Sequence, residues 1–69
     1  MDIGDEVLWD GEKWFIDNTD EEFKDEDEEI SAFILPIKYA DQAAYDVIFE
    51  SGQIDNLGYW VYISDLTKA

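Results

Sequence analysis

The sequence lacks cysteine, histidine and arginine altogether and contains a single proline. Without cysteine the chain can form neither a disulfide nor a thiolate metal site, which excludes the stapled architecture of small secreted domains. The usual general base and thiol nucleophile are missing as well, and there is no glycine-rich phosphate loop. We therefore expect a protein that is not an enzyme and that binds no cofactor.

Long apolar runs are also missing. No stretch approaches the roughly 18 apolar residues of a membrane span, and no basic-then-apolar leader follows Met1. The sequence predicts a cytoplasmic protein without membrane association. Its 69 residues fit one domain, 1–69, and an apolar content of 46% indicates a folded chain.

Positive charge is scarce. Four lysines oppose 19 aspartates and glutamates, for a net charge of −15. Such a charge excludes direct binding to nucleic acid phosphates or anionic membranes and favours basic partners. The acids are densest in residues 17–29, where nine of thirteen side chains are carboxylates. We expect this segment to be a solvated loop, because acids four residues apart repel one another in a long helix.

The acidic segment superficially resembles a calcium-binding loop. The candidate oxygen ligands are Asp17, Thr19, Glu21, Asp25 and Glu28. The sharp turn of such a loop needs glycine at its sixth position, and here that residue is Glu22. The sequence therefore predicts no dedicated metal site.

Short apolar runs separated by turn residues predict five strands. Asp10-Gly11 is a strong hairpin turn, because glycine adopts positive φ without penalty, and it separates predicted strands at 6–10 and 12–17. Residues 30–37 are apolar on both faces of a strand. Pro36, which lacks an N–H group, marks an edge, a bulge or the end of that strand.

Residues 38–51 fit two structures. Helical spacing and a stop at Gly52 favour a helix that contains Ala40, Ala43, Ala44, Val47 and Ile48. The alternation of Tyr45, Val47 and Phe49 with acids favours a strand instead. We favour a turn or single helical turn at 39–43 followed by a strand at 44–50, with the helix as the alternative.

The C-terminal third predicts a loop, a strand and a turn. Residues 51–58 form a loop tucked in by Ile54 and Leu57, residues 59–63 form the last strand, and residues 64–66 form a 3₁₀ turn. With these five strands, the alternation predicts an interior of Val7, Trp9, Trp14, Ile16, Phe33, Leu35, Val47, Phe49, Val61 and Ile63. It leaves an exposed apolar set of Leu8, Phe15, Ile34, Ile48, Trp60 and Tyr62, available to a partner or to a second copy.

Three short motifs resemble those of SH3-like barrels of the Tudor and KOW kind. They are Ile3-Gly-Asp-Glu-Val7 at the start, Tyr45-Asp-Val-Ile-Phe-Glu-Ser-Gly52, and Tyr59-Trp-Val-Tyr-Ile-Ser-Asp-Leu66 at the end. The resemblance implies an all-β or mainly β fold: a five-stranded SH3-like barrel with an acidic loop, 17–29, between its second and third strands. No basic patch of the kind used by nucleic-acid-binding members is present.

In size and charge the chain also resembles small acidic proteins of phages and mobile elements that act as DNA mimics. The resemblance implies an inhibitor, in the host cytoplasm, that occupies the basic surface of a nucleic-acid-binding protein. We expect Trp60 and Tyr62 to add apolar anchorage to the charges of Asp17, Asp20, Glu21, Glu22, Asp25, Glu26, Asp27, Glu28 and Glu29. The alternative is a small adaptor or homodimeric module whose acidity serves only solubility.

Overall fold

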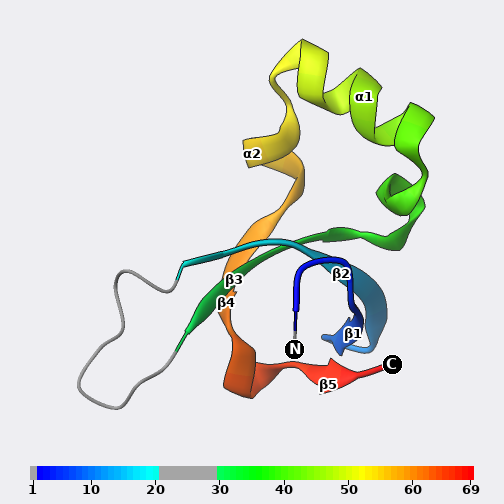
Figure 1. Cartoon of the computed structure of the whole chain (residues 1–69). Coiled ribbons are helices and arrows are strands. Elements are labelled where there is room, and N and C mark those ends of the chain that lie inside the picture. The colour runs from blue at the N-terminus through cyan, green and yellow to red at the C-terminus, as the bar shows by residue number, and fades with distance from the viewer. Residues whose placement is uncertain (1, 21–29) are drawn as a thin grey trace.

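The computed structural model describes residues 2–20 and 30–69, whose strands form one antiparallel sheet (Figure 1). The strands are β1 (Glu6–Trp9), β2 (Glu12–Asp20), β3 (Ser31–Pro36), β4 (Tyr59–Tyr62) and β5 (Thr67–Lys68). Their order across the sheet is β4-β3-β2-β1-β5, so β4 and β5 are its edges. The prediction of a mainly β protein is confirmed, but the sheet is not closed into a barrel.

Two helices make the all-β form of the prediction wrong. A 3₁₀ turn, η1 (Ile37–Ala40), and the helices α1 (Gln42–Ser51) and α2 (Ile54–Leu57) connect β3 to β4. Figure 1 shows α1 and α2 leaving the sheet after β3 and returning to it at β4. A second 3₁₀ turn, η2 (Ile63–Asp65), connects β4 to β5.

The first hairpin forms as its turn dipeptide predicts. Asp10 and Gly11 both have positive φ, 53° and 77°, and Trp9 pairs with Glu12 across the turn. Positive φ at both central residues matches the twist of the strands on either side. The indole N–H of Trp14 donates a hydrogen bond of 3.0 Å to the carbonyl oxygen of Trp9, which ties the two strands together beyond their ladder.

β2 is longer than predicted, which corrects the start of the acidic loop. The strand runs to Asp20, and it pairs with β3 as far as Asp20 opposite Ser31. The register shifts between Ile16 and Asn18, so Asp17 is the extra residue of a β-bulge. Residues 17–20 are therefore strand, and the rest of the predicted loop, 21–29, lies outside the described residues.

Residues 42–51 are helical, so the predicted strand at 44–50 is wrong and the alternative is right. Asp41 caps the helix by accepting a hydrogen bond of 3.2 Å from the backbone N–H of Ala44. Gly52 ends it with a left-handed φ of 72° and donates its N–H to the last carbonyls. These caps favour the helix that the apolar spacing also predicts. The strand-favouring residues inside the segment do not determine where an element begins and ends.

The loop predicted at 51–58 contains α2, and its two apolar residues tuck in as expected. The last predicted strand and turn are confirmed with boundaries shifted by one residue, as β4 and η2, and Leu66 is buried beside them. β5 was not predicted, because two residues are too few to show alternation. The count of five strands therefore holds only because β5 takes the place of the strand expected at 44–50.

Both faces of the sheet are covered, which changes the predicted interior. One face carries the inner core, formed by Val7, Trp14, Ile16, Ala32, Ile34 and Leu66. The other carries the helix-side core, formed by Phe15, Phe33, Leu35 and Ile48, against which Ile54 and Leu57 of α2 also pack. Phe15, Ile34 and Ile48 were expected outside and are buried, while Val47 and Phe49 were expected inside and are 67% and 66% exposed.

The sheet curls around its inner core. The rings of Tyr59 in β4 and Trp9 in β1 lie 5.4 Å apart although two strands separate them in the sheet. Trp14 meets both rings, at 5.4 Å from Trp9 and 5.8 Å from Tyr59. Edge-to-face and tilted contacts at these distances are favourable, so this aromatic cluster holds β4 over β1.

The N-cap of α1 gives a direct test of the helix. Asp41→Ala should lower the free energy of unfolding by about 1 kcal/mol, because the N–H of Ala44 loses its acceptor. Asp41→Asn keeps an acceptor and should retain most of the stability. Urea unfolding followed by circular dichroism measures both variants. An Asp41→Ala protein as stable as the parent would contradict the cap.

Substitution of Gly58 tests the contact between the sheet and the helical arm, which consists of η1, α1 and α2 (residues 37–57). The φ of −109° at Gly58 suits any residue, but an added Cβ would overlap the ring of Phe33 and lie 2.7 Å from the carbonyl oxygen of Ile34. Gly58→Ala should therefore lower the free energy of unfolding by about 1–3 kcal/mol. In a Phe33→Leu background the additional loss should be smaller, because the overlapped ring atoms are gone. Equal losses in both backgrounds would argue against this packing.

Candidate functional site

The acidic residues that the structure describes all lie at the surface. No charged or polar side chain of residues 2–20 or 30–69 is buried. Asp17 and Asp20, the two predicted site acids in this part of the chain, are half-buried on β2. The fully exposed acids belong to β1, β2, α1, α2, η2 and the turns between elements, and they are Asp2, Glu6, Asp10, Glu12, Asp41, Asp46, Glu50, Asp55 and Asp65.

The other predicted acids fall on residues that the structure does not describe. They are Glu21, Glu22, Asp25, Glu26, Asp27, Glu28 and Glu29. Their attachment points are described, because Asp20 ends β2 directly opposite Ser31, which begins β3. The segment that carries them therefore starts and returns at one end of the β2–β3 pair.

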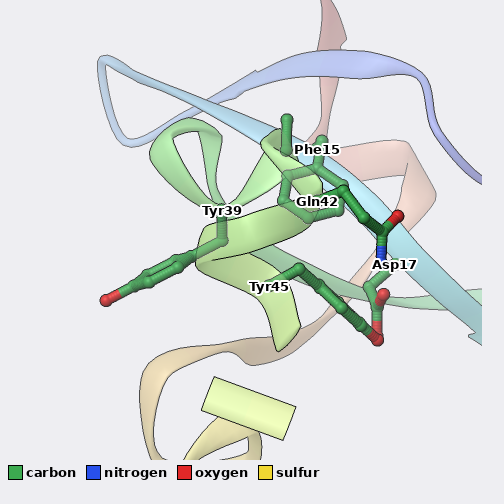
Figure 2. Close-up of a pocket in the computed structure, with 6 residues that line it drawn as sticks. Phe15, Asp17, Tyr39, Gln42 and Tyr45 are labelled. Atoms are coloured by element: carbon green, nitrogen blue, oxygen red, sulfur yellow. The ribbon is translucent and has the colours of Figure 1, made fainter. Parts of the chain in front are cut away.

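The bulge at Asp17 turns its carboxylate toward α1. A bulge adds one residue to a strand and redirects the side chains beside it. Figure 2 shows the Asp17 carboxylate and the Tyr45 hydroxyl pointing toward one another, and the Tyr45 hydroxyl donates a hydrogen bond to this carboxylate. The contact links β2 to the helical arm.

This contact forms one wall of a shallow pocket of ≈ 220 Å³ between β2, η1 and α1. Phe15 and Tyr39 contribute apolar surface, and Gln42 contributes an amide beside Asp17. In Figure 2 the Tyr39 ring extends away from Tyr45. The two tyrosines therefore do not face one another as the walls of an aromatic cage.

The environment of Tyr45 changes its acidity. Partial burial raises the pKa of the Tyr45 hydroxyl above its ordinary value of 10.0. The hydrogen bond to Asp17 raises this pKa further, as do the negative charges of Asp17 and Asp46, because all three disfavour a tyrosinate anion. The hydroxyl therefore stays protonated, and a hydrogen-bond donor, throughout the neutral range.

The predicted apolar anchors, Trp60 and Tyr62, are on the edge strand β4. Their side chains are 54% and 48% exposed, and the Trp60 ring lies 5.3 Å from the ring of Phe33 in the helix-side core. Tyr59, the first residue of the same strand, is 53% exposed although it contacts Trp9 and Trp14. Of the exposed aromatics in the described part of the chain, Tyr59, Trp60 and Tyr62 thus lie on one strand, as the sequence predicts for Trp60 and Tyr62, whereas Phe49 lies on α1.

The sequence does not predict the Asp17–Tyr45 contact. It depends on a bulge and on a helix where a strand was favoured, and neither can be read from the spacing of these two residues. In the described part of the chain no group of three or more metal-ligating side chains converges. No helix there is long and apolar enough to cross a membrane.

Comparisons with known proteins identify no relative. No protein-family model matches the chain, and neither a curated protein nor a solved structure shows significant similarity to it.

The Asp17–Tyr45 contact predicts an alkaline effect on stability. Because the pKa of Tyr45 is raised by folding, the stability that this residue contributes is fully present below pH 10.0 and is lost as the pH rises through its folded-state pKa. In an ultraviolet absorbance titration, one tyrosine should ionise at a pH above the ordinary tyrosine pKa of 10.0, and Tyr45→Phe should remove this transition. Asp17→Asn should move that transition down, because one neighbouring negative charge is gone. A titration curve unchanged by Asp17→Asn would contradict the contact.

Proposed function

We propose that this protein is a non-enzymatic binding protein that occupies the basic surface of a nucleic-acid-binding protein by mimicking DNA. The observation that carries the proposal is the distribution of charge. A net charge of −15 belongs to 69 residues, and every described carboxylate is at the surface. Duplex DNA presents roughly one charge per 1.7 Å of its axis, and closely set carboxylates on a small body offer a basic groove a similar density.

The segment 17–29 is the proposed centre of the mimic. It holds nine of the 19 acids, and both of its ends join the β2–β3 pair. Asp17 and Asp20 are held on β2 by the sheet, so part of the charge is fixed before binding. A fixed charge loses less conformational entropy when it meets a partner than a mobile one does.

The scaffold that we propose for this charge is a partly open SH3-like barrel with a helical insertion. The strand order supports it, since the last strand returns beside the first after a 3₁₀ turn. The packing of Tyr59 over Trp9 supports the curvature that a barrel needs. The helices α1 and α2 are then an addition between the third and fourth strands.

The second candidate function is a protein–protein adaptor whose acidity serves solubility. The exposed aromatic side chains of β4 favour it, because an aromatic cluster at the surface often anchors a protein interface. The two functions differ in the side chains that the partner contacts. These are the carboxylates in the mimic, and Trp60 and Tyr62 in the adaptor.

Competition with duplex DNA tests the mimic. A basic nucleic-acid-binding protein captured at low salt should bind either this protein or DNA in an electrophoretic assay, and never both. Binding should weaken steeply with salt, because both surfaces release counterions. One Glu→Gln change in 21–29 should cost only about 0–1 kcal/mol, whereas neutralising Glu21, Glu22, Asp25, Glu26 and Glu28 together should abolish competition.

The matched control removes the same charge elsewhere. It neutralises Glu6, Glu12, Asp46, Glu50 and Asp55, and it should weaken competition far less than the variant in 21–29. Trp60→Ala and Tyr62→Ala should reduce adaptor binding more than mimicry. A ternary complex with DNA, or full competition after the five changes in 21–29, would leave the adaptor as the function.

A further inference from the structure

β4 has a partner strand on one side only within the described part of the chain. It pairs with β3 along its whole length, from Tyr59 opposite Ile34 to Tyr62 opposite Ser31, and it ends the sheet. An edge strand carries a row of backbone N–H and C=O groups that another extended chain can pair with.

The hydrogen bonds of the neighbouring residues show which groups face outward. The N–H of Ile63 donates to the carbonyl oxygen of Ile30 at 2.9 Å, so these two residues, which follow the Ser31–Tyr62 pair in register, occupy a hydrogen-bonded position. In an antiparallel pair, hydrogen-bonded and non-hydrogen-bonded positions alternate. Val61 is therefore bonded to β3, whereas the N–H and C=O groups of Trp60 and Tyr62 point away from it.

The same two residues supply side chains for a partner. Trp60 and Tyr62 lie on one face of β4, about half exposed, and Trp60 already contacts Phe33. Alternate side chains of an added strand would lie beside these rings, so that backbone pairing supplies affinity and the rings supply specificity.

Edge strands are usually protected, and within the described part of the chain β4 lacks several of the usual protecting features. Charged residues, proline and bulges are the common devices that prevent an edge from pairing, and Tyr59–Tyr62 contains neither charge nor proline and has no register shift with β3. The other edge, β5, is only two residues long and ends in Lys68. The difference marks β4 as the edge that is open to pairing.

The charge of the chain determines which kind of segment can pair with β4. A second copy would bring a further −15 against the first, and the exposed Asp55 and Asp65 belong to α2 and η2, the elements that flank β4. Four residues offer few hydrogen bonds to offset that repulsion. A segment that carries positive charge instead gains from the same field.

We infer that the open edge of β4 is a docking site for an extended, lysine- or arginine-containing segment of another protein, which pairs with β4 as an added strand. The inference needs no DNA mimicry, and it holds for an adaptor as well. It predicts where the partner's backbone bonds form: at Trp60 and Tyr62, and not at Tyr59 or Val61.

Amide hydrogen exchange measured by NMR tests the edge. In the free protein the amides of Trp60 and Tyr62 should exchange faster than that of Val61. The probe is a short synthetic peptide in which Lys alternates with Val or Thr, and at saturation it should slow exchange at Trp60 and Tyr62. The same peptide with Glu in place of Lys should not bind.

Backbone pairing is separated from simple charge attraction by two controls. A Lys peptide that is N-methylated at alternate residues keeps its charge but loses the donors of one edge, and it should bind about ten- to a hundredfold more weakly. Trp60→Pro removes one outward N–H without touching the bonds to β3 and should weaken binding of the unmodified peptide more than Trp60→Ala does.

Three results would overturn the docking site. They are unchanged exchange at Trp60 and Tyr62 at peptide saturation, equal binding of the N-methylated peptide, and protection in the free protein that rises with its concentration. The third result would assign the edge to a second copy. Failure of the DNA competition with success here would remove only the mimicry.

Discussion

A strand that is apolar on both faces must be covered on both, and β3 imposes this requirement on the whole chain. Ala32 and Ile34 are fully buried in the inner core, and Phe33 and Leu35 are buried in the helix-side core. Burial of an Ile, Leu or Phe side chain contributes about 1.5–3 kcal/mol, and each face of β3 carries at least one of them, so neither face can be left to solvent. The sheet covers the first face by curling on itself, and α1 with α2 covers the second.

The elements with strong local signals could be predicted from the sequence. The Asp10-Gly11 turn defines the first hairpin by its backbone chemistry, and the Ser64-Asp65-Leu66 motif indicates the turn that follows β4. The segment 42–51 could not be decided by pattern, because its apolar residues fit both periods. Its structure follows from Asp41 and Gly52 at its ends and from the uncovered face of β3, which is a tertiary constraint.

The candidate site likewise contains residues whose placement could be predicted from the sequence and residues whose placement could not. Trp60 and Tyr62 could be predicted to be exposed, because strand alternation alone assigns them to one face of β4. Asp17 could not be placed against Tyr45, since a bulge shifts the register by one residue and no local pattern announces it. The role of the acids of 21–29 remains a sequence-based prediction, because these residues lie outside the described ones and charge density favours a basic partner without specifying which one.

The pairing of β2 with β3 brings together the two ends of the most charged segment, so the fold of the sheet does not depend on how long this segment is. Asp20 and Ser31 lie opposite each other, so whatever joins them begins and ends at one point of the scaffold. The entropy cost of closing such a connection grows only with the logarithm of its length, at about 0.6 kcal/mol per doubling. The residues that form the two described cores all lie in 2–20 and 30–69. Changes in the length of the connection therefore cost little closure entropy, and the same position is a natural site for grafting a foreign sequence.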